Sequence, residues 1–71
     1  MSLRYATDFS GENTLTLDKI QHGKYVVRGC EWGDHAVVKY CQTIEEANSV
    51  FDTRLAYLQE MDEMGIVERE L

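Results

Sequence analysis

Two cysteines and two histidines, Cys30, Cys41, His22 and His35, are the side chains of this sequence that could bind a soft metal ion. Zinc sites usually take their ligands from closely spaced Cys or His pairs, and these four residues do not have that spacing. On one hairpin, Cys30 and Cys41 would lie about four residue pairs apart, roughly 13 Å at the rise of a strand. That separation is too long for a disulfide. We therefore expect no metal, no cofactor and two reduced thiols that pack as small apolar groups.

Cys30 and His35 could also form a nucleophile with its base. Such a pair needs hydrogen-bonding distance and a cleft with groups that stabilise the reacting oxygen. In the expected hairpin these two residues would be diagonal neighbours on an open sheet face. A chain of 71 residues also has little room for an enclosed site. We expect no catalytic residues and a protein that is not an enzyme.

Acidic residues are the other candidates, and they are concentrated in one part of the chain. The net charge is −6, and residues 43–71 hold eight of the 13 acids but only two of the seven basic residues. Their spacing is not that of an oxygen-ligand loop for calcium. Two interpretations remain: a solvated helix face, or a surface that imitates nucleic acid and competes for a basic groove on another protein. The acids in question are Glu45, Glu46, Asp52, Glu60, Asp62 and Glu63.

The element that carries these acids is predicted to be one long helix over residues 43–64. Thr43 and Glu46 have the spacing of a capping box, and Gly65 suits the left-handed position after a helix. Apolar residues recur at intervals of three and four and form one stripe, with acids on the remainder. The stripe consists of Ile44, Ala47, Phe51, Leu55 and Leu58, flanked by Val50 and Met61.

The residues before the helix are predicted to form its packing surface, a three-stranded antiparallel β-meander over residues 14–42. Thr14 to Lys19 alternates in polarity, and Gln21-His22-Gly23 suits a hairpin loop. Tyr25 to Trp32 and His35 to Gln42 are the next strand candidates, with Gly33-Asp34 as the turn. Residues 1–13 are expected to be an arm or short edge strand, and residues 65–71 a tail. The fold class is then α+β, in a single domain of order βββα.

This turn would set which side chains share a sheet face. Leu15 and Leu17 would lie beside Gly29 and Val27, on the face that meets the helix. That face would also carry Tyr25, Ala36, Val38 and Tyr40. The opposite, open face would carry Val26, Arg28, Cys30, Trp32, Val37, Lys39 and Cys41. Arg28 and Lys39 would oppose each other there, which needs a compensating acid such as Asp18 or an external anion or partner.

The segment from about Lys24 to Leu58 resembles the three-strand-plus-helix domains of the AP2 and integrase arm-binding kind. The likeness lies in the last strand and the helix opening Thr43-Ile44-Glu45-Glu46-Ala47. The resemblance implies an open sheet face that enters the major groove of DNA. The matching positions are Arg28, Trp32, His35 and Lys39. The few cations and the net charge of −6 count against duplex binding, which depends largely on phosphate neutralisation.

We therefore predict a small cytoplasmic, non-enzymatic protein-binding regulator or inhibitor of the kind that phages and mobile elements encode, anti-CRISPR proteins included. Its partner would be a protein with a basic nucleic-acid-binding surface, and no membrane span is expected. The predicted contact residues are Glu45, Glu46, Asp52, Glu60 and Glu63, with Trp32 as an aromatic anchor. The alternative is a nucleic-acid-binding module that uses Arg28, His35 and Lys39. A homodimer through the open face is compatible with both.

Overall fold

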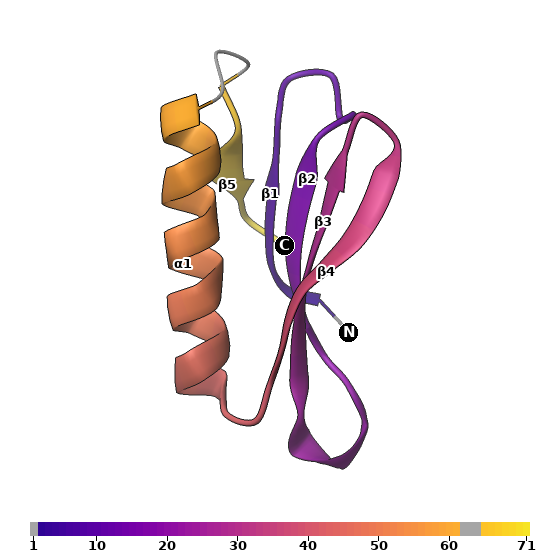
Figure 1. The fold of residues 1–71 in the computed structure, drawn as a ribbon, viewed down its shortest axis with the longest axis vertical. Helices are drawn as coiled ribbons and strands as arrows, with labels where there is room; N and C mark the ends of the chain where they lie inside the picture. The colour runs from indigo at the N-terminus through magenta and orange to yellow at the C-terminus, as the bar shows by residue number, and fades with distance from the viewer. Residues whose placement is uncertain (1, 62–64) are drawn as a thin grey trace.

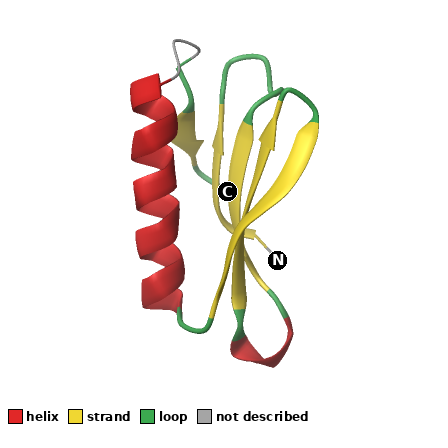
Figure 2. Cartoon of the chain, viewed as in Figure 1, coloured by secondary structure: helices red, strands yellow, loops and turns green. Residues whose placement is uncertain are grey.

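The computed structural model describes residues 2–61 and 65–71, in which a five-stranded antiparallel sheet carries one α-helix across one face (Figure 1). The elements are β1 (Ser2–Thr7), β2 (Thr14–Lys19), a 3₁₀ turn (Gln21–Gly23), β3 (Tyr25–Glu31), β4 (Asp34–Cys41), α1 (Ile44–Met61) and β5 (Val67–Arg69). The strand order is β4-β3-β2-β1-β5 (Figure 2). The domain is α+β, but the prediction of a three-stranded meander is wrong.

The two additional strands come from the ends of the chain. β1 lies inside the sheet between β2 and β5, where Ala6 pairs with Leu15 on one side and Glu68 on the other. The predicted arm is thus an interior strand, and the predicted tail contains a short edge strand. A three-residue strand is too short to show an alternating pattern, so the sequence signal for β5 was absent. Ile66 holds this segment in place, because its side chain is 1% exposed.

The β3–β4 turn consists of Trp32 and Gly33 instead of the predicted Gly33-Asp34. Both residues have positive φ, 52° and 88°, the signature of a type I′ hairpin turn. Glu31 therefore pairs with Asp34, and Cys30 pairs with His35. The pairing differs from the predicted one by two residues, which leaves every side chain on the predicted face up to Val37.

A bulge at Val38 then reverses the faces of the last three β4 residues. Arg28 pairs with Val37 but Val27 pairs with Lys39, so Val38 is the extra residue. Lys39 and Cys41, predicted on the open face, lie on the helix side. Tyr40, predicted against the helix, lies on the open face beside Val26.

The helix begins at the predicted N-cap Thr43, and Glu46 reaches back as expected, but to the amide one residue before that of a standard capping box. The Glu46 amide donates to Thr43 Oγ1 at 3.1 Å, and the Gln42 amide donates to Glu46 Oε1 at 3.1 Å. Gly65 has the expected left-handed φ of 70°. The predicted helix end at residue 64 lies outside the described residues.

The core lies between α1 and the sheet, and the expected apolar stripe of the helix contributes to it. Leu15 pairs with Gly29 and Leu17 pairs with Val27, as predicted. Phe51 is the largest fully buried side chain. The buried cluster consists of Ala6, Leu15, Leu17, Val27, Cys41, Ala47, Phe51 and Ile66.

Arg4 joins β1, β5 and α1 at the rim of this core. Its guanidinium lies 4.2 Å from the centre of the Phe51 ring and donates twice to the Glu68 carboxylate, at 2.7 and 2.8 Å. It also donates to Asn48 at 3.2 Å and pairs with Asp52 at 2.7 Å. Hydrogen bonds to Glu68 raise the pKa of Arg4 above its ordinary value, against the opposing effect of burial.

Ile66→Ala tests whether the last residues are part of the folded core. Removing a buried side chain of this size should lower the free energy of unfolding by about 2–5 kcal/mol. Urea denaturation followed by circular dichroism measures the loss. Leu71→Ala is the matched control, because Leu71 is 73% exposed. Equal stability of the two variants would contradict the packing of Ile66.

Glu68 should make stability depend on pH in the acid range. Hydrogen bonds from Arg4 lower the pKa of Glu68 below its ordinary value of 4.5. The stabilisation is therefore complete above about pH 4.5 and is lost as the pH falls through the lower, folded-state value. In denaturation experiments, the stability difference between the wild type and Glu68→Gln should shrink from about pH 6 to about pH 3.

Salt and a charge-matched variant serve as controls for this pH dependence. Glu68 is part-exposed, so added salt should reduce the difference. Glu45→Gln removes one charge from an exposed residue that has no ion pair among residues 2–61 and 65–71. A difference between the wild type and Glu68→Gln that stays constant across the pH range would contradict the assigned role of Glu68.

Candidate protein-binding surface

The predicted acidic contact residues divide into two groups. Glu46 pairs with Lys39 at 2.9 Å, and Asp52 pairs with Arg4 at 2.7 Å, so both carboxylates serve the fold. Glu45 and Glu60 are exposed and form no ion pair within the described part of the chain. Glu63 lies outside the described residues. The helix therefore presents fewer free carboxylates than the sequence suggests.

The Lys39–Glu46 pair connects the end of β4 to the first turn of α1. The hydrogen bond with Lys39 lowers the pKa of Glu46, and the bond from the Gln42 amide adds to that effect. The same pair raises the pKa of Lys39. Both groups stay charged at neutral pH, and each offsets the other's field.

The alternative nucleic-acid site is not assembled on one face. Arg28 and His35 lie on the open side of the sheet, whereas Lys39 lies on the helix side. Arg28 is also 4.0 Å from the Asp18 carboxylate, the acid expected to compensate it. Because the negative charge of Asp18 offsets that of Arg28, this part of the open face carries little net positive charge. Ser2 donates to the same carboxylate.

Edge strand β4 is exposed along most of its length, since only Cys41 of its eight residues is buried. Four of the nine large exposed apolar side chains among the described residues lie in this strand and its turn. These four are Trp32, Val37, Val38 and Tyr40. Trp32 and Tyr40 are each 64% exposed. The exposed apolar surface is thus concentrated on one edge of the sheet.

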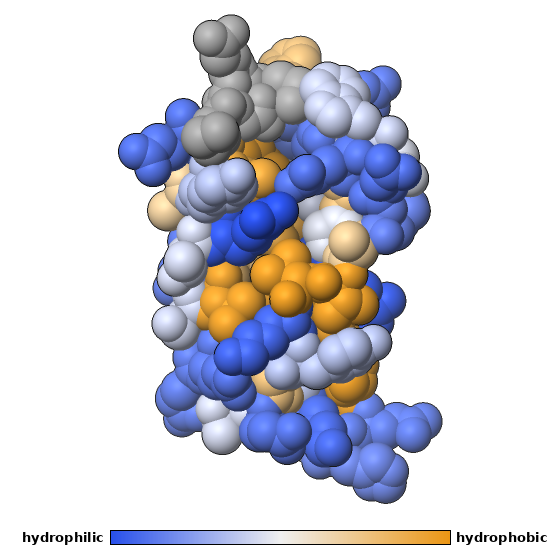
Figure 3. Space-filling model, viewed as in Figure 1, coloured by the Kyte–Doolittle hydropathy of each residue, from blue (hydrophilic) through white to orange (hydrophobic). Residues whose placement is uncertain are grey.

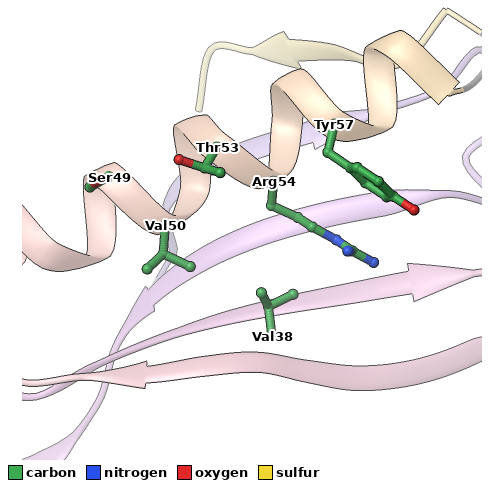
Figure 4. A pocket seen from close by; sticks show the side chains of 6 residues that line it. All are labelled: Val38, Ser49, Val50, Thr53, Arg54 and Tyr57. Atoms are coloured by element: carbon green, nitrogen blue, oxygen red, sulfur yellow. The ribbon is translucent and has the colours of Figure 1, made fainter.

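An apolar groove runs between β4 and α1 on the same side of the molecule. Val38 extends from the strand toward the helix, and Val50 and Tyr57 extend from the helix toward the strand (Figure 4). Hydrophobic residues gather between α1 and β4 in the space-filling view, with hydrophilic ones around them (Figure 3). Arg54 crosses the groove, 5.0 Å from the Tyr57 ring centre and 3.0 Å from the Glu31 carboxylate. The groove is therefore lined by apolar side chains, and the charge of Arg54 is offset by Glu31.

Cys30 and His35 are direct cross-strand neighbours instead of the expected diagonal ones, with 3.8 Å between Cys30 Sγ and His35 Nε2. They line an open pocket together with Trp32 and Glu12. No group of three metal-binding side chains occurs in the described residues, and both cysteines are free. Cys41 is buried in the core, where burial raises the pKa of its thiol.

Phe9 is an exposed aromatic residue that sequence reasoning missed. It is 96% exposed in the loop between β1 and β2. The Asp8 carboxylate holds this loop by accepting bonds from the Gly11 amide at 2.7 Å and Asn13 Nδ2 at 2.8 Å. The bond from Asn13 lowers the pKa of Asp8. The Asp-Phe-Ser-Gly stretch was a usable turn signal, but nothing in it showed that the ring faces water.

Val38, Tyr40 and Tyr57 were also missed as surface residues. The alternation of β4 predicted that Val38 and Tyr40 would be covered by the helix. The bulge turned Tyr40 outward, and Val38 and Tyr57 are part-exposed in the groove between β4 and α1. No residue pattern in the strand marks the bulge.

Comparisons with protein-family models, curated proteins and solved structures give no match to this chain. The resemblance to AP2 and integrase arm-binding domains therefore rests on residues 24–58 alone. No helix among the described residues is both long and apolar enough to span a membrane.

The two thiols should differ sharply in reactivity. Cys30 is part-exposed, whereas Cys41 is 1% exposed. A thiol reagent that gives a coloured product should modify one cysteine quickly in the native protein and the second only after denaturation. Cys30→Ser should abolish the fast phase, and Cys41→Ser should leave it intact. Two fast thiols in the native wild type would contradict the buried position of Cys41.

Proposed function

We propose that this chain is a small non-enzymatic protein-binding regulator or inhibitor, in which Trp32 and the β3–β4 hairpin anchor the partner. The partner is a protein with a basic nucleic-acid-binding surface, and binding competes with nucleic acid for that surface. The conformation of Trp32 is the observation that carries the proposal. The acidity of the chain supports the nature of the partner.

Trp32 occupies a backbone position that disfavours it. The first residue of a type I′ turn has positive φ, and Asn, Asp or Gly is the usual choice. A bulky residue with φ of 52° is strained by about 1–3 kcal/mol. Burial does not repay this strain, since the indole is 64% exposed. A strained and exposed tryptophan is best explained by binding, because Trp is the residue type most enriched among interface hot spots.

Electrostatic steering supplies the preference for a basic partner. The net charge of −6 attracts a basic surface over roughly the 10 Å Debye length of 0.1 M salt. Glu46 and Asp52 are engaged by Lys39 and Arg4, so their direct contribution to contact is smaller than the sequence suggests. Glu45 and Glu60 are the helix acids available to a partner.

Trp32→Asn should separate binding from stability. Asn fits the turn better, so the free energy of unfolding should rise by about 0.5–1 kcal/mol. Partner binding should fall by at least about thirtyfold, because a hot-spot aromatic contributes roughly 2 kcal/mol or more. Lysate capture on the immobilised protein, followed by elution with short duplex DNA, measures the binding. A partner captured equally by the wild type and by Trp32→Asn would contradict the proposal.

Charge-reversal variants test the competition with nucleic acid. Glu45→Lys and Glu60→Lys should slow association at about 50 mM salt and have little effect at about 500 mM. A gel shift of the protein itself with duplex DNA at about 50 mM salt would support the sheet-face alternative instead. In that case Arg28→Ala should reduce the shift, and the helix variants should not.

A further inference from the structure

β4 is the long unpaired edge of the sheet. The two edge strands are β4, with eight residues, and β5, with three. Within the described residues, β4 pairs only with β3, so one side of its backbone has N–H and C=O groups without a strand partner. An extended backbone is the natural complement of such an edge, because it satisfies the row of donors and acceptors at once.

Apolar side chains flank this edge on both faces of the sheet. Val37 and Tyr40 lie on the open face, at 43% and 64% exposure. Val38 and Tyr57 lie on the helix side, in the groove between β4 and α1. The bulge creates this arrangement, since without it Tyr40 would point to the helix. An added strand would thus place alternate side chains against apolar surface on either face.

Charges at the two ends of the edge define the chemistry of the added strand. Asp34 begins β4, and Glu45 lies in the first helical turn just beyond its end. Neither forms an ion pair within residues 2–61 and 65–71. The two cations beside the groove, Lys39 and Arg54, are already neutralised by Glu46 and Glu31. The ends of the edge therefore favour basic residues on the partner.

We propose that β4 binds an extended segment of the partner as a sixth strand, with alternating apolar residues between terminal Lys or Arg residues. At about 3.3 Å per residue, a segment of eight residues matches the length of the edge. This inference rests on the proposed function, because it names the part of the basic partner that contacts the hairpin.

A defined peptide provides the first test. The probe is an eight-residue peptide with Val and Thr alternating between terminal lysines, titrated into ¹⁵N-labelled protein at about 50 mM salt. The largest amide shift changes should lie in residues 34–40. A peptide with glutamates at both ends should bind with an affinity at least about tenfold lower. Two further peptides carry N-methyl groups at every second residue, one on the odd and the other on the even positions. The peptide whose N-methyl groups face β4 should not bind, because it cannot donate to the edge.

Two variants of the protein control for general loss of stability. Val38→Asp should abolish the shift changes, whereas Val67→Asp on the other edge strand should leave them intact. Native dispersion of the spectrum shows that each variant is folded. Equal binding of both N-methylated peptides, or binding retained by Val38→Asp, would overturn the sixth-strand inference. Shift changes in residues 34–40 that grow with protein concentration alone would overturn it in favour of a second copy of the chain.

The outcomes for the inference and for the proposed function are distinguishable. Suppose that a partner is captured through Trp32 and released by DNA, but that no peptide binds at β4. This outcome would overturn the inference and leave the proposed function standing. Peptide binding at β4 without such a partner would support the inference and count against the proposed function.

Discussion

The placement of a guanidinium group over the Phe51 ring is the constraint on which much of this small fold depends. Arg4 can occupy that position because Asn48, Asp52 and Glu68 surround it with acceptors. These groups belong to α1 and β5, and Arg4 belongs to β1, so one side chain holds the first strand, the last strand and the helix together. A domain of this size buries only about 60% of its unfolded surface, and such a polar cluster extends the core at low cost in apolar residues.

The single extra residue at Val38 determines the character of the opposite edge. It brings Lys39 to Glu46, Cys41 into the core and Tyr40 to the open face. One irregularity therefore stabilises the start of the helix and creates an exposed aromatic surface. The structural and the proposed binding roles of β4 follow from the same change of register.

The sequence predicted the local features well and the long-range ones poorly. Thr14 to Lys19, the capping box at Thr43 and the pairing of Leu15 with Gly29 rest on alternation, spacing and turn residues, which act over a few positions. β5 has no periodic signal, and its pairing with β1 depends on the folded positions of Ile66 and Arg4. The bulge at Val38 likewise has no signal in the local sequence. Among the candidate site residues, the exposed place of Trp32 at the hairpin tip agrees with its position in the sequence, but the partners of Glu46 and Asp52 required the fold.

An unpaired edge strand also has a consequence for the colloidal behaviour of the chain. Exposed, apolar edges are templates for growth into fibrils, and proteins usually blunt them with charge or irregular backbone. Here the net charge of −6 provides that protection. Mutual repulsion vanishes near the isoelectric point, about pH 4.7. The acidity that we propose attracts a basic partner thus also keeps the free protein dispersed. In that proposal, neutralisation by the bound partner coincides with covering of the edge.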